Sequence, residues 1–116
     1  MRLINVFAAL SGVLALFMLV IAAHVLNPAP EDAERIHLGA FIQLIAAVTG
    51  LVLAGRSGRL NAIAAAMILG GAALFSATLY ALAITHERSF IMLAPVGGTT
   101  LILGWLVLAA AKPGRT

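Results

Sequence analysis

The chain has 116 residues, of which 63% are hydrophobic and only 9% are charged, and its mean hydropathy is +1.12. A soluble domain carries roughly a quarter charged residues, and a chain this short has too little interior to hide so much apolar surface. The composition therefore excludes a soluble globular protein and predicts a membrane protein whose main partner is the lipid bilayer. The absence of cysteine excludes disulfides, thiolate nucleophiles and cysteine-based metal sites.

The net charge of +3 and the pI near 10.7 also occur in nucleic-acid-binding proteins. The seven Lys and Arg residues are scattered at the ends of apolar runs, however, and no aromatic residues are interleaved with them. Such a distribution is typical of membrane-topology signals. We therefore predict no nucleic-acid partner.

The first predicted span covers residues 3–26 and ends where Pro28 and Pro30 disfavour further helix. About 20 apolar residues cross a bilayer core of about 30 Å, so this run is long enough. A cleaved signal peptide is the alternative interpretation. Its hydrophobic region would have only about 7 to 15 residues, and we therefore expect a retained span.

The second and third predicted spans cover residues 36–54 and 60–84. A polar, proline-rich connector with three of the four acidic residues precedes the second span, and we expect this connector to be a solvated loop. Only the glycine-rich segment 55–59 separates the two spans, so they must be antiparallel neighbours.

The fourth predicted span covers residues 90–111, but Pro95 and the Gly97-Gly98 pair interrupt it. Because proline suits the first turn of a helix, we expect regular helix from about Pro95, with residues 90–94 as an irregular segment packed against other helices. The four spans together predict an all-α membrane protein. Its expected fold is an antiparallel bundle of four transmembrane helices that forms one domain over residues 1–116.

Small residues recur along one face of the second span and one face of the third, at steps of three or four. Such faces let helix backbones approach closely in lipid, so we expect these two to meet. Gln43, deep in the second span, is expected to bond a neighbouring helix rather than a substrate. The predicted helix-packing residues are Gly39, Gln43, Gly50, Ala66, Gly70, Ala73, Ala77, Gly97 and Gly98.

The positive charges predict the orientation of the chain. Five of them lie on the side of the termini: Arg2, Arg56, Arg59, Lys112 and Arg115. The other two, Arg35 and Arg88, lie on the opposite side. By the positive-inside rule, both termini are expected to be cytoplasmic.

The polar residues of the opposite, outer face are the candidates for chemistry. His24, His37, His86 and Glu87 are expected there, and imidazole with carboxylate could bind a divalent metal or relay a proton. No pair of them has the i, i+4 spacing of ligands on one helix. Interfacial histidines beside a solvated loop are therefore the favoured interpretation, and we predict no metal and no cofactor.

Four short motifs in a fixed order carry a family resemblance. They are Ala8-Ala9-Leu10-Ser11-Gly12, Ala23-His24-Val25-Leu26, the run LFSATLY from Leu74 to Tyr80, and Pro95-Val96-Gly97-Gly98 followed by Gly104-Trp105. With these motifs the chain resembles the bacterial membrane family called domain of unknown function 423, whose animal relatives are known as transmembrane protein 256. The resemblance implies a four-helix protein of the bacterial inner membrane and brings no catalytic residue to this sequence.

Three classes of function are compatible with the sequence. The favoured one is a non-enzymatic structural or accessory protein that forms a small homo-oligomer or joins a larger membrane complex, because small-residue faces are present and charged residues at bilayer depth are not. A small ion or solute transporter or channel is the second, although proton-coupled exporters need a buried carboxylate. A metal-handling or proton-handling protein that uses the outer-face histidines is the third.

Overall fold

Four long α-helices make up the protein. The computed structural model describes residues 2–24, without the side chain of His24, together with residues 30–85 and 91–111. The helices are α1 (Arg2–His24), α2 (Pro30–Ala54), α3 (Arg59–Thr85) and α4 (Leu93–Ala110), and the described residues contain no strand. All four are long and apolar enough to cross a membrane. The predicted all-α membrane fold with four transmembrane helices is therefore confirmed.

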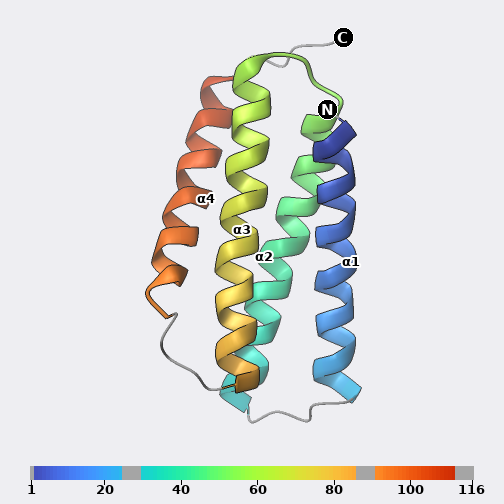
Figure 1. Cartoon of the computed structure of the whole chain (residues 1–116), viewed down its shortest axis with the longest axis vertical. Helices are drawn as coiled ribbons and strands as arrows, with labels where there is room; N and C mark the ends of the chain where they lie inside the picture. Colours follow the sequence, from blue (N-terminus) through green and yellow to red (C-terminus); the bar gives the residue numbers. More distant parts are fainter. Residues whose placement is uncertain (1, 25–29, 86–90, 112–116) are drawn as a thin grey trace.

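The helices are arranged as an open, antiparallel row rather than as a closed bundle (Figure 1). Each packs against the next in chain order, α1 makes only a small contact with α3, and within the described residues α4 contacts α3 alone. The molecule measures 46 × 26 × 18 Å, so it is flat in cross-section. The central helix α3 thus has a neighbour on each side, and α4 forms one edge of the row.

The core between the helices is built mainly from small side chains. Among the described residues, ten of the seventeen buried apolar ones are alanines. In lipid no hydrophobic force drives helices together, so close packing of their backbones has to supply the attraction, and alanine permits that approach. On α1 the buried face includes Ala8, Ser11, Ala15 and Ala22, a spacing of three, four and seven residues that matches one side of a helix.

Helix α2 begins six residues earlier than the sequence indicated. Pro30 occupies its first position, which suits proline because the first amides of a helix have no intrahelical acceptor. Glu31 and Asp32 follow in the first turn, where carboxylates interact favourably with the helix dipole. Asp32 also accepts a 2.9 Å hydrogen bond from the guanidinium of Arg35, one turn along. The acidic part of the expected solvated loop, from Pro30 on, is therefore helical.

The fourth helix begins close to where the sequence indicates: we expect regular helix from about Pro95, and α4 begins two residues earlier, at Leu93, after a turn at Ile91 and Met92. Helix α4 is continuous from Leu93 to Ala110, and it includes Gly97 and Gly98. Pro95 lies in the first turn, where its missing amide hydrogen costs no intrahelical bond. The flexibility that glycine adds to a helix is offset here because α4 packs closely against α3 at Gly97.

A tight turn joins α2 to α3. The amides of Gly55 and Arg56 donate to the carbonyls of Val52 and Leu53, which ends α2. Gly58 has a φ of +107°, a conformation that strains any residue with a side chain. Asn61 then donates a 2.9 Å hydrogen bond from its side-chain amide to the carbonyl of Ser57. The turn therefore holds α2 and α3 as antiparallel neighbours.

Candidate functional site

The most polar buried contact in the described part of the chain lies between α2 and α3. The hydroxyl of Ser76 donates a 2.7 Å hydrogen bond to the carbonyl oxygen of Gly39. The hydroxyl of Tyr80 donates a bond of the same length to the side-chain oxygen of Gln43. Gly39, Gln43, Ser76 and Tyr80 are all buried. We call these four residues the buried polar cluster.

Antiparallel geometry explains why Tyr80 reaches Gln43. Side chains on a helix tilt toward its N-terminus, so those of Tyr80 and Gln43 extend toward each other along two antiparallel helices. Gly39 lies between them, and a β-carbon built on it would be 3.1 Å from the Tyr80 ring and 3.4 Å from the α-carbon of Ser76. The missing side chain at Gly39 therefore leaves room for the ring and lets Ser76 approach the exposed carbonyl.

The side chains of the buried polar cluster are suited to joining helices. Its side chains are an amide, a hydroxyl and a phenol, none of which is charged at neutral pH, and each hydroxyl donates to an acceptor on the facing helix. Other hydroxyl groups bond within their own helix, as Thr78 does to Leu74 and Thr100 to Val96. The hydroxyl groups of the buried polar cluster thus join α2 to α3, whereas those of Thr78 and Thr100 are satisfied within their own helices.

The outer-face candidates are only partly described. His37 is exposed on α2, and its ring stacks on that of Phe41 with centroids 6.1 Å apart. His86, Glu87 and the side chain of His24 lie outside the described residues. No three His, Asp or Glu side chains of the described part come together as metal ligands. A metal or proton site at this face remains a hypothesis from the sequence.

The predicted packing residues of α2 do lie at helix contacts. Gly39, Gln43 and Gly50 are buried, and a β-carbon on Gly50 would be 2.8 Å from the side chain of Leu69 and 3.1 Å from the β-carbon of Ala8. Gly50 therefore lies where α1, α2 and α3 come together.

The face predicted for α3 was wrong. Ala66, Gly70 and Ala77 are exposed and Ala73 is only half-buried; a β-carbon on Gly70 would meet no atom within 4 Å. The buried small residues of α3 are instead Ala64, Ala65, Gly71, Ala72, Ser76 and Ala83. Small residues occur on every side of α3. Their spacing therefore also fits a face that no neighbouring helix covers, and the prediction selected that face.

Glycines bring the backbones of α3 and α4 into direct contact. A β-carbon on Gly71 would lie 2.7 Å from the Leu101 nitrogen and 2.9 Å from the Gly97 carbonyl oxygen, and one on Gly97 would lie 2.6 Å from the Phe75 nitrogen. Gly104 continues the contact two turns on, where a β-carbon would be 3.0 Å from the backbone of Ile68. Gly98, predicted with Gly97, would make only an ordinary 3.8 Å contact with the Phe75 ring.

Sequence reasoning missed Gly71 and Gly104. The detectable signal was their spacing, since Gly97 and Gly104 are seven residues apart and therefore share a face of α4. They are also the two buried residues of that helix. Gly71, the second residue of the Gly70-Gly71 pair, faces them from α3.

A double-mutant cycle tests the buried hydrogen bond between α2 and α3. Tyr80→Phe and Gln43→Leu are each expected to destabilise the protein, and their effects should be non-additive by about 0.6 kcal/mol, with an upper range of about 1.7 kcal/mol for bonds between membrane helices. Reversible unfolding in mixed micelles measures this coupling. Tyr80→Phe combined with Thr100→Val is the control, because Thr100 bonds only within α4, and that pair should be additive. Equal coupling in both pairs would contradict the assignment.

Comparison with known proteins places this arrangement in a family. Residues 20–98 match the family described as "Protein of unknown function (DUF423)". The "UPF0382 inner membrane protein YgdD" of Escherichia coli (strain K12) is 31% identical over 113 residues, which cover 92% of this chain and 86% of the relative. A protein of the same name from Shigella flexneri matches equally well.

Another relative matches a shorter segment of the chain. The "UPF0382 membrane protein SERP0230" of Staphylococcus epidermidis is 42% identical over 45 residues, or 39% of this chain and 37% of that protein. No solved structure matches the chain. The family match covers more than half of the sequence, and the four helices have the length and apolar composition of membrane spans. This chain is therefore an integral membrane protein of the DUF423 family.

Proposed function

We propose that the chain is a non-enzymatic structural or accessory protein of the bacterial inner membrane, which self-associates as a small homo-oligomer or joins a larger membrane complex. The observation that carries this proposal is the open edge of the row. Helix α4 packs against α3 alone, and only Gly97 and Gly104 of its residues are buried. Most of its length is therefore free to contact another transmembrane helix.

The use of the polar groups supports the same function. The buried polar cluster joins α2 to α3 through hydrogen bonds that are already made inside the protein. A transporter or channel needs polar or charged groups that face a pathway at bilayer depth. Here the described ion pair, between Asp32 and Arg35, lies in the first turns of α2. The transport alternative therefore has less support than a packing role.

We also propose that both termini are cytoplasmic. Helices α1 and α3 both begin at the same end of the molecule, and this end carries Arg2, Arg56 and Arg59 (Figure 1). The acidic residues Glu31, Asp32 and Glu34 belong to the start of α2, at the opposite end. An excess of positive charge in short loops favours the cytoplasmic side.

Energy transfer in liposomes tests self-association. A single cysteine introduced at Ala110 on α4 can carry either a donor or an acceptor dye, because the natural chain has no cysteine. The efficiency of energy transfer is expected to exceed that of randomly distributed chains and to remain high when the lipid-to-protein ratio is raised. Leu106→Arg on the exposed side of α4 should weaken it, whereas Leu10→Arg, on the exposed side of α1, should weaken it less.

Two results would contradict the proposal. The first is a transfer efficiency no higher than that of randomly distributed chains, combined with native mass spectra of gently solubilised membranes that show only single chains and no other subunit in fixed ratio. The second is a flux of ions or small cations through proteoliposomes above that of empty liposomes, which would favour the transport alternative.

A further inference from the structure

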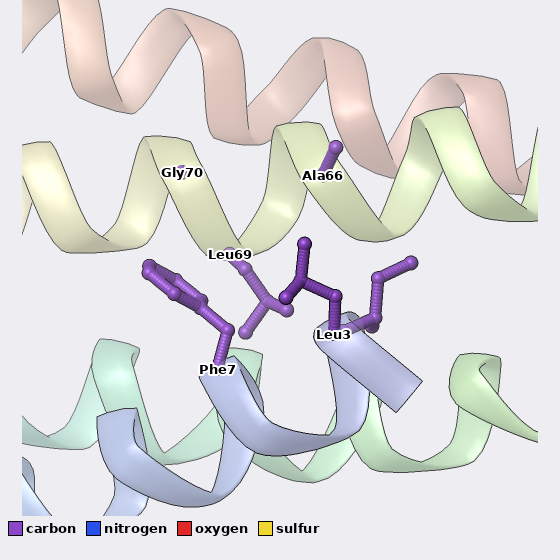
Figure 2. Close-up of a pocket in the computed structure, with 6 residues that line it drawn as sticks. Leu3, Phe7, Ala66, Leu69 and Gly70 are labelled. Carbon is purple, nitrogen blue, oxygen red and sulfur yellow. The ribbon is translucent and has the colours of Figure 1, made fainter. Parts of the chain in front are cut away.

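A groove of about 260 Å³ runs between α1 and α3 near the end at which both helices begin. Its lining is wholly apolar and comprises Leu3, Ile4, Phe7, Ala66, Leu69 and Gly70. Figure 2 shows Leu3 and Phe7 extending from α1 toward α3, where Ala66 and Gly70 contribute almost no side chain. The groove is open to the surroundings of the helices, which in a membrane are lipid.

The groove exists because two helices do not close on each other. Helix α1 packs mainly on α2 and makes only a small contact with α3. On the α3 side, no atom lies within 4 Å of a β-carbon built on Gly70. Leu69 is buried and forms the floor, while Phe7 is 46% exposed and forms a wall. The result is an apolar groove between the two helices.

Three arginines lie at the end of the molecule that is nearest to this groove. Arg2 directly precedes Leu3 in α1, Arg59 is the first residue of α3, and Arg56 lies in the turn before it. The chain's acidic residues are Glu31, Asp32, Glu34 and Glu87. The first three lie in the opening turns of α2, at the far end of the molecule, and the described ion pair is there as well. The arginines at the groove therefore have no described carboxylate beside them.

We propose that this groove holds one acyl chain of an anionic phospholipid whose phosphate binds Arg2 and Arg59. The apolar walls match a hydrocarbon chain, and the arginines match the charge of the head group, which guanidinium groups bind through paired hydrogen bonds. This lipid site does not depend on self-association or on the orientation of the termini.

Charge also distinguishes lipid from a second copy of the protein. A second copy inserted in the same orientation would bring its own Arg2 and Arg59 to the same end of the groove. Like charges brought together oppose association. An anionic lipid instead neutralises them, and each basic residue near a membrane surface favours such lipids.

Native mass spectrometry of the full chain released from micelles tests the site with dioleoyl-phosphatidylglycerol and dioleoyl-phosphatidylcholine as probes. We expect one phosphatidylglycerol to be retained in preference to phosphatidylcholine, on the order of 30-fold for two arginines. Arg2→Gln with Arg59→Gln should abolish that preference. Gly70→Leu should fill the groove and lower retention of both lipids, and because no atom lies near that position the variant should fold normally.

Two further variants keep the test decisive. Ala66→Leu fills the same groove from the neighbouring turn of α3 and should reproduce the loss. Ala77→Leu changes an exposed residue of α3 outside the groove and should retain lipid like the natural chain. Equal retention of the two lipids by the natural chain would overturn the proposal. A Gly70→Leu variant that retains lipid as the natural chain does would also overturn it. So would a Gly70→Leu variant that retains lipid but no longer forms dimers, since this second result would assign the groove to a second copy.

Discussion

Leucine at Gly71 or Gly97 is expected to separate α4 from α3 and to lower the free energy of unfolding by at least about 3 kcal/mol. The β-carbon alone would lie 2.6 to 2.9 Å from backbone atoms of the facing helix. Backbone cannot rotate away as a side chain can, so the whole helix has to move. Because α4 contacts only α3 among the described residues, it has no second neighbour to hold it in place.

The two glycine pairs supply matched controls for this experiment. Gly70→Leu is one residue from Gly71 and meets open space, while Gly98→Ala is one residue from Gly97 and meets the Phe75 ring at an ordinary 3.8 Å. Thermal unfolding in detergent should show a large loss at Gly71 and Gly97 and little change at the controls. Similar losses at all four positions would mean that the α3–α4 contact is not built on these particular glycines.

Leucine at Gly39 is expected to separate α2 from α3 and to cost about 2 to 3 kcal/mol. A side chain there would displace the Tyr80 ring, which lies 3.1 Å from the β-carbon position, and would push Ser76 off the Gly39 carbonyl. Both hydrogen bonds of the buried polar cluster would then be lost together. Gly39→Ala should have a smaller effect, since an aromatic ring can yield by a few tenths of an ångström.

A spectroscopic signal separates this effect from general loss of stability. Tyr80 is the single tyrosine of the chain, so tyrosine absorption reports directly on its hydrogen bond to Gln43. Gly39→Leu should shift that absorption in the folded protein, as Gln43→Leu should. Gly12→Ala, where the new β-carbon meets Ala47 at an ordinary 3.7 Å, should leave the absorption unchanged and should not lower stability, because alanine favours helix more than glycine does. An unshifted tyrosine signal in Gly39→Leu would contradict the proposed role of Gly39.

The number and order of the helices could be predicted from the sequence because lipid imposes a simple requirement. Each crossing needs a long apolar run with its backbone bonded internally, and the four runs are separated by polar or glycine-rich segments. The third span, expected at 60–84, is α3 at Arg59–Thr85. Boundaries were less predictable where a helix continues past the apolar run. Helix α2 includes Glu31 and Asp32 because acidic residues suit the start of a helix.

Helix neighbours were harder to predict than the helices themselves. Gln43 stood out because a strongly polar side chain in a span needs a partner, and it accepts a bond from Tyr80 on α3. The packing face of α3 had no such marker. Gly70 and Gly71 are adjacent, yet one faces open space and the other faces α4. Only the position of the neighbouring helix distinguishes the two glycines, and the spacing of residues along the sequence does not show where that helix lies.

The uncovered face of α3 could not be predicted from the sequence for the same reason. Ala66 and Gly70 look like contact residues in the sequence because they are small, but α1 lies against α2 and leaves them uncovered. The same two residues then become part of the groove between α1 and α3. Small residues on an uncovered face leave space for a ligand, whereas on a covered face they let helices approach.

Cysteine labelling in intact cells tests most directly the claim that four antiparallel helices cross the membrane with both termini inside. The natural chain has no cysteine, so Glu31→Cys before the apolar part of α2 and Ser57→Cys in the turn after it provide single sites at opposite ends of one helix. A membrane-impermeant maleimide is expected to label Glu31→Cys from outside the cell and Ser57→Cys only after permeabilisation. Labelling of both positions from the same side would contradict the account.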